Sequence, residues 1–164
     1  MSESPAETLV RLGSLEVTDR ADTLMALGLG SCVAVILHDA KAKVGGLAHI
    51  LLPSQSLSRD STNPARSADT AVPHLLQLMH ERGASRSQVV ARLVGGASMF
   101  ADLLAAGTVH IGERNVNACR LSLRRAGVPI VGEAVGGQKS RSVWLDVGRG
   151  TVTVRTVGGE PTTI

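Results

Sequence analysis

Aromatic side chains are almost missing from this chain of 164 residues, which contains one Trp, one Phe and no Tyr. Proteins that bind single-stranded nucleic acid usually stack the bases on aromatic rings beside a basic groove. The sequence cannot supply a row of such rings, which argues against nucleic-acid binding. Val, Leu, Ile and Ala must therefore fill the interior of the protein.

Long hydrophobic runs are missing as well. No stretch approaches the roughly 20 apolar residues that a membrane-spanning helix requires. Residues 1–10 carry acidic side chains where a signal peptide needs a basic start and an apolar centre. We therefore expect a cytoplasmic protein that does not insert into a membrane.

Cysteine is scarce, with Cys32 and Cys119 as the only two. In a reducing compartment a structural disulfide between them is not expected, so each must be explained as a thiol. The five histidines and two cysteines show no Cys-x-x-Cys or His-x-x-x-His spacing. We accordingly expect neither a metal site nor a cofactor.

The excess of positive charge is small, at +3, and the arginines are spread along the chain with acidic residues between them. This pattern favours an ordinary solvated surface, and the alternative is a preference for an acidic partner surface.

The order of apolar and polar segments predicts a flexible N-terminus at residues 1–8, followed by one domain at residues 9–164. Short runs of Val, Leu and Ile between residues 9 and 52 indicate strands, and residues 53–66 indicate a surface loop. Asp69 is expected to cap a first helix that ends at Gly83, and residues 113–125 are expected to form a second. Further strands are expected at residues 89–94, 128–135, 142–147 and 151–157. Many strands with two helices predict an α+β fold.

Cys32 stands at the junction between a glycine-rich turn and an apolar strand. Glycine allows a close approach of the backbone to a substrate, so the amide groups of Gly30 and Ser31 could hold a developing oxyanion. This arrangement makes Cys32 a candidate nucleophile, although a small buried core residue is the commoner role of cysteine. Cys119 fits that second role better, because it shares an apolar helical stripe with Val116 and Leu123.

His49 strengthens the case for Cys32. If residues 33–37 and 44–51 form a hairpin, opposed residues have numbers that sum to about 81 or 82, which brings residues 32 and 49 into register. The two side chains would then face each other with β-carbons about 4.5–5.5 Å apart. A thiol beside an imidazole base predicts a cysteine hydrolase that attacks a carboxamide through a thioester. The alternative for His49 is a packed core histidine.

Residues 113–115 (Glu-Arg-Asn) open the second predicted helix. An acidic residue there suits the helix dipole, and capping or surface solvation is at least as well supported as a catalytic role.

With these motifs, the sequence resembles the CheD family of chemoreceptor glutamine deamidases over residues 24–159. The resemblance rests on Leu27-Gly28-Leu29-Gly30-Ser31-Cys32, Val44-Gly45-Gly46-Leu47-Ala48-His49, Ala68-Asp69-Thr70-Ala71, Gly95-Gly96-Ala97, Ile111-Gly112-Glu113-Arg114-Asn115-Val116 and Val135-Gly136-Gly137. It implies deamidation of glutamines in receptor cytoplasmic helices, with Cys32 as nucleophile and His49 as its histidine. It also implies a CheC-type phosphatase partner and a β-sandwich with helices packed outside, similar to the cysteine-dependent deamidase toxins.

The sequence departs from the family pattern at Ala26, where the family usually has a threonine thought to orient the histidine. A hydrogen bond to a charged group is typically worth about 1.5–3 kcal/mol, so its loss could slow turnover by roughly tenfold to a hundredfold. Ser67 stands where an aromatic is common, and Ser140 where glycine is usual. The alternative function is therefore a catalytically weakened binding module that regulates a CheC-type phosphatase.

Overall fold

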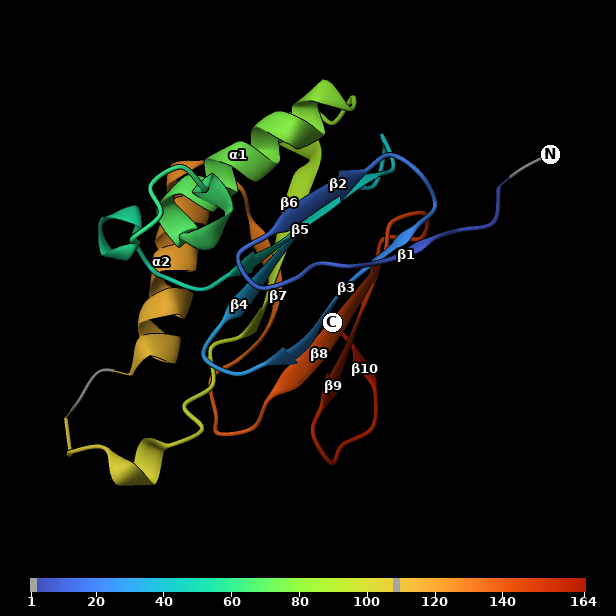
Figure 1. Ribbon diagram of the computed structural model, residues 1–164. Coiled ribbons are helices and arrows are strands. Elements are labelled where there is room, and N and C mark those ends of the chain that lie inside the picture. Colours follow the sequence, from blue (N-terminus) through green and yellow to red (C-terminus); the bar gives the residue numbers. More distant parts are fainter. Residues whose placement is uncertain (1–2, 108–109) are drawn as a thin grey trace.

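Two β-sheets and two helices form three layers in the computed structural model, which describes residues 3–107 and 110–164 (Figure 1). The central sheet has the strand order β2-β5-β4-β6-β7, and the outer sheet has the order β1-β3-β8-β9-β10. Helices α1 (Ala68–Glu81) and α2 (Ile111–Arg125) cover the face of the central sheet that points away from the outer sheet.

The strands of the central sheet are β2 (Leu15–Thr18), β4 (Val33–Asp39), β5 (Val44–Ile50), β6 (Val89–Gly95) and β7 (Ile130–Val135). Those of the outer sheet are β1 (Glu7–Leu9), β3 (Thr23–Leu29), β8 (Arg141–Asp146), β9 (Thr151–Thr156) and β10 (Thr162–Thr163).

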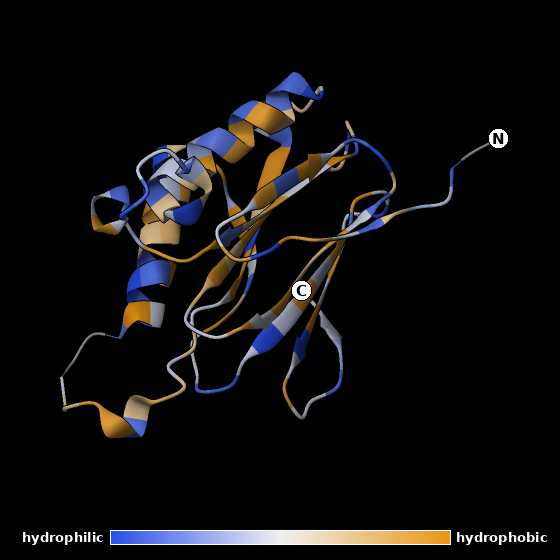
Figure 2. Ribbon diagram, in the orientation of Figure 1, coloured by the Kyte–Doolittle hydropathy of each residue, from blue (hydrophilic) through white to orange (hydrophobic). Residues whose placement is uncertain are grey.

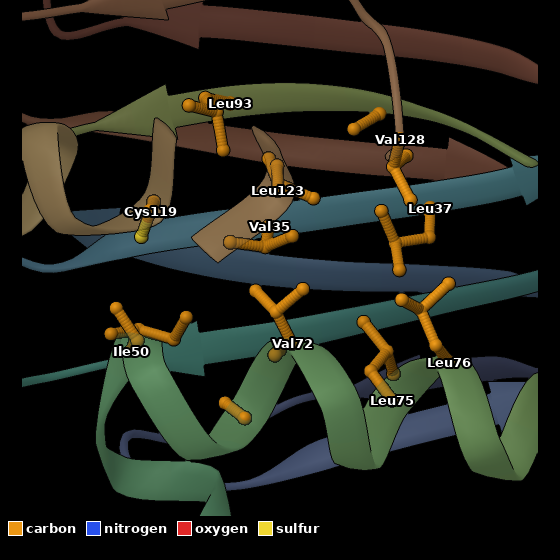
Figure 3. Packing of buried hydrophobic residues seen from close by; sticks show 14 of the residues in the cluster. Val35, Leu37, Ile50, Val72, Leu75, Leu76, Leu93, Cys119, Leu123 and Val128 are labelled. Atoms are coloured by element: carbon orange, nitrogen blue, oxygen red, sulfur yellow. The ribbon is translucent and has the colours of Figure 1, made fainter. Parts of the chain in front are cut away.

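Every residue of β4 and β5 is buried, because these strands lie in the middle layer and pack on both faces. Val35 and Leu37 of β4 point to the helices, whereas Ala34 and Ile36 point to the outer sheet. Figure 3 shows the helix side of this packing, with Val72 and Leu75 of α1 turned toward the strands. Alternate residues of a central strand therefore pack either into the core beneath the helices or into the core between the two sheets.

Helix α1 begins two residues earlier than the sequence predicts. Ser67, not Asp69, is its N-cap residue, and Asp69 lies in the first turn, where the helix dipole favours a negative charge. The Asp69 carboxylate accepts hydrogen bonds from the Gln55 amide at 2.9 Å and from the Ser54 hydroxyl at 3.2 Å. Asp69 therefore holds the loop after β5 in place through these hydrogen bonds instead of capping the helix.

The predicted fold class, an α+β sandwich with two main helices outside, is confirmed. Strand β1 begins at Glu7, inside the segment 1–8 that was expected to be loose, and pairs in parallel with β3. Residues 1–2 of that segment lie outside the described residues. Along the described parts of the chain, no helix combines the length and the apolarity that crossing a membrane would need.

Candidate active site

Cys32 lies in the turn that connects β3 of the outer sheet with β4 of the central sheet, directly before Val33, the first residue of β4. Gly28, near the end of β3, has a left-handed backbone with φ of +65°, which glycine adopts readily. The chain passes from the outer to the central sheet shortly after it. The Cys32 side chain is partly exposed and packs against the apolar cluster between the two sheets. Its thiol is thus at the edge of the core and open to solvent on one side.

The backbone around Cys32 is held through its carbonyl oxygens. The amide of Ala97 donates to the Gly30 carbonyl and the amide of Gly96 donates to the Cys32 carbonyl, both at 2.8 Å. The Ser31 carbonyl accepts a hydrogen bond of 2.9 Å from the side-chain amide of Asn115. Among the described residues, the amides of residues 30–32 donate no hydrogen bond to a protein group.

His49 lies near the end of β5, is only 7% exposed, and occupies a position that faces the outer sheet. Its ring Nδ1 is 3.1 Å from the carbonyl oxygen of Val10. A carbonyl can only accept, so Nδ1 carries the proton in this hydrogen bond and Nε2 keeps a free lone pair. The ring is therefore oriented with Nε2 as its accepting nitrogen.

The predicted pairing of Cys32 directly opposite His49 is wrong. The hairpin pairs Ala34 with His49 and Asp39 with Val44, so paired residues sum to 83. The turn is set by Asp39, whose carboxylate accepts from the amides of Lys41 at 3.0 Å and Ala42 at 2.9 Å. Cys32 therefore stands diagonal to His49, and within the described chain the two side chains form no hydrogen bond.

The diagonal position keeps the two side chains on one face. The register differs by two residues from the predicted one, and a shift of two leaves a strand's faces unchanged. Diagonal neighbours in a sheet are separated by about 7–8 Å between α-carbons, within reach of longer side chains. Cys32 and His49 are therefore diagonal neighbours on the face of the central sheet that points to the outer sheet.

Burial sets the charge states of both groups. It raises the pKa of the Cys32 thiol above its usual 9.0. It also lowers the pKa of His49 below its usual 6.5, which the hydrogen bond to Val10 only partly offsets. At neutral pH the resting pair is thus a thiol and a neutral imidazole, rather than an ion pair.

Ala26, at the position where the family has its hydroxyl, is completely buried in β3. It pairs with Val143 of β8 and belongs to the apolar cluster between the sheets. The polar partner that His49 has in this protein is the Val10 carbonyl. The hydrogen bond of the His49 ring is therefore made with a backbone group of the N-terminal segment and not with β3.

A pocket of about 200 Å³ adjoins the Cys32 turn at Ser31. It is lined mainly by apolar side chains, among them Met99, Phe100 and Leu104. Phe100 is 69% exposed, and Figure 2 shows the short helix that follows it, Ala101–Leu103, projecting from the body of the protein. A second pocket, of about 460 Å³, lies between α1 and α2, and its lining includes neither Cys32 nor His49.

Within residues 3–107 and 110–164, the His, Cys, Asp and Glu side chains form no group of three or more that could hold a metal ion. Cys119 is completely buried among the helix-side core residues, and burial strongly raises the pKa of its thiol. This environment agrees with the predicted packing role of Cys119.

Asn115 is the residue near Cys32 that the sequence reasoning missed. For residues 113–115 the sequence supports capping or solvation at least as well as a catalytic role, but Asn115 is buried and its side-chain amide reaches the Cys32 turn. The only signal in the sequence was its place in one of the blocks that carry the family resemblance.

Comparison with known proteins gives consistent matches. The family model described as CheD chemotactic sensory transduction matches residues 51–156. The chain is 38% identical over 158 residues to the probable chemoreceptor glutamine deamidase CheD of Desulforamulus reducens, which covers 96% of this chain and 95% of the relative. It is 41% identical over 146 residues to the protein of the same name from Methanococcus vannielii, with coverage of 89% and 92%.

Solved structures are more distant. The hypothetical protein YfiH of Bacillus licheniformis superposes with a TM-score of 0.46 and 15% sequence identity, over 73% of this chain and 49% of the other.

Proposed function

Because the chain belongs to the CheD family, we propose that it is a chemoreceptor glutamine deamidase with Cys32 as nucleophile and His49 as general base. The observation that carries the proposal is that Cys32 and His49 approach from adjacent strand ends on the same face of the central sheet. The relatives carry that activity in their names. The substrates are glutamine side chains in the cytoplasmic helices of chemoreceptors.

The reaction begins with transfer of the Cys32 thiol proton to Nε2 of His49. The thiolate attacks the carbon of the glutamine carboxamide, and the carbonyl oxygen becomes an oxyanion. Backbone amides in the turn formed by residues 30–32 would stabilise this charge, since their carbonyls are already engaged elsewhere. A donor in such a position is typically worth a factor of about 10²–10³ in kcat.

Ammonia leaves in the next step. The protonated His49 donates its proton to the amide nitrogen, the C–N bond breaks, and a thioester between Cys32 and the former glutamine remains. A water molecule then loses a proton to His49 and attacks the thioester. The products are a glutamate side chain and the regenerated Cys32 thiol.

The neutral resting pair suits this sequence of steps. A buried imidazole with a lowered pKa remains able to accept a proton at and below neutral pH. The thiol is protonated until a substrate arrives, which limits its reaction with other electrophiles. The pocket beside Ser31 could take an apolar side chain that flanks the target glutamine on a receptor helix.

The test is ammonia release from a receptor cytoplasmic fragment, together with the mass increase of about one dalton that converts each glutamine to glutamate. Cys32→Ala should abolish both while the protein stays folded. Cys119→Ala is the matched control, because it removes the other thiol at a position inside the core. Undiminished release by Cys32→Ala would overturn the proposal.

The alternative is a weakened enzyme that acts as a binding module for a CheC-type phosphatase. Two observations favour it: Ala26 lacks the family hydroxyl, and burial raises the pKa of the Cys32 thiol. In that case receptor fragments would release no ammonia, and the purified chain would bind and regulate the phosphatase. Ammonia release that requires a receptor fragment and is abolished by Cys32→Ala would rule the alternative out.

A further inference from the structure

Asn115 connects the two chain segments that bear Cys32 and His49. Its side-chain amide donates one hydrogen bond to the Ser31 carbonyl at 2.9 Å and a second to the Leu51 carbonyl at 3.0 Å. Ser31 precedes Cys32, and Leu51 follows His49 by two positions. The last paired residues of this hairpin are Val33 and Ile50. The Asn115 amide therefore bridges β4 and β5 where their own ladder ends.

The approach of α2 to this point depends on small residues. A β-carbon on Gly112 would lie 2.6 Å from the Ala97 carbonyl oxygen and 2.7 Å from that of Gly96. A β-carbon on Gly96 would overlap with the Val116 side chain. The Gly96 amide also donates to the Cys32 carbonyl, so the residue against which the helix packs also holds the cysteine turn.

The energetics indicate a specific reason for an amide at this position. Asn115 is fully buried, and its side-chain oxygen has no hydrogen-bond partner among the described residues. An unsatisfied buried polar atom costs free energy, so an apolar side chain would serve packing better. What the amide offers instead is two donors aimed at two backbone carbonyls.

We propose that Asn115 is a positioning residue for the reaction: by bridging Ser31 and Leu51 it fixes the distance between the Cys32 thiol and the His49 ring. This inference rests on the proposed function for its catalytic consequence. The diagonal placement of the two side chains makes the distance sensitive, because no direct ladder pair sets it. A misplacement of about 1 Å can cost a hundredfold in rate.

Asn115→Ala should lower kcat for ammonia release by roughly tenfold to a hundredfold and leave KM within about twofold, since the lost function is alignment and not substrate binding. Asn115→Asp keeps the shape of the side chain but loses both donors, and it provides a second test if the alanine variant does not fold. Asn117→Ala, at an exposed position on the same helix, should leave kcat unchanged.

A loss of stability alone must be distinguished from a loss of alignment. Cys119→Ala removes buried packing one turn further along α2 without touching these hydrogen bonds, and it serves as the stability-matched control. Equal losses of kcat in Asn115→Ala and Cys119→Ala at equal stability would overturn the proposal. Full kcat in a folded Asn115→Ala or Asn115→Asp would do the same.

Alkylation of Cys32 by iodoacetamide tests the positioning role without any receptor substrate. In the otherwise unchanged protein, His49→Gln should slow alkylation, because the imidazole assists removal of the thiol proton. With Asn115→Ala already present, His49→Gln should have less than half of that effect on the logarithm of the rate. An undiminished effect would overturn the positioning role. The unsubstituted protein could release no ammonia while Asn115→Ala still weakens the effect of His49→Gln on alkylation. That result would overturn the proposed deamidation but not the positioning role.

Discussion

His49 pairs across the β4–β5 ladder with Ala34, and Cys32 stands two residues before Ala34 on the same side of the sheet. This diagonal relationship brings the candidate nucleophile and base to one face without a direct ladder pair between them. Two neighbouring groups hold this arrangement: the Val10 carbonyl accepts from the His49 ring, and the Asn115 side-chain amide bridges the strand ends.

His49→Gln should reduce kcat/KM for ammonia release by about 10²–10⁴, the range typical of a lost general base. In the unchanged protein, kcat/KM should fall on acidification only below pH 6.5, because burial lowers the pKa of His49 from that value. The measurement is the pH profile of kcat/KM on a receptor fragment. An acid limb centred above pH 6.5 would show that another group is the base.

The stability of the fold should depend on pH through the same residue. The pKa of His49 is lower in the folded than in the unfolded chain, so the unfolded chain binds more protons below pH 6.5. The free energy of unfolding should therefore be unaffected by His49 above pH 6.5 and should decrease as the pH falls below it. Urea unfolding at several pH values should show a weaker decrease for His49→Gln. Identical pH dependence in both proteins would contradict this expectation.

Ala26→Thr should not raise kcat, although it restores the family's usual residue. The Val10 carbonyl already accepts the proton of His49 Nδ1, and Ala26 lies in a tightly packed apolar cluster. The larger polar side chain should lower the free energy of unfolding by about 1–3 kcal/mol. Denaturant unfolding and steady-state rates measure the two effects separately. A clear gain in kcat would mean that Val10 does not suffice to orient the ring.

Gly95→Ala should displace the Cys32 turn. Gly95 has φ of +116°, and a β-carbon there would overlap with the Cys32 carbonyl oxygen. We expect lower stability and loss of most of the ammonia release. Gly83→Ala is the matched control, because Gly83 has φ of +101° with open space around it, and it should cost only the backbone strain of roughly 1–2 kcal/mol. Equal effects of the two changes would show that steric overlap at Cys32 is unimportant.

The hairpin illustrates how far the sequence could predict the site. The sequence predicts a hairpin of residues 33–37 and 44–51 whose paired residues sum to about 81 or 82, and only an odd sum puts positions 32 and 49 on one face. It could not give the register, because the turn length depends on how the Asp39 carboxylate binds the amides of Lys41 and Ala42. The predicted face was therefore correct, and the predicted direct opposition was two residues out of register.

The sequence by itself determined the α+β class, the two helices, the hairpin that places Cys32 near His49, and the family, because periodicity and ordered motifs are local properties of the chain. Only the tertiary structure decided what surrounds the pair. Val10 and Asn115 lie 39 residues before His49 and 84 residues after Ser31, respectively. Contacts over such separations arise from the packing of layers, which no local pattern encodes.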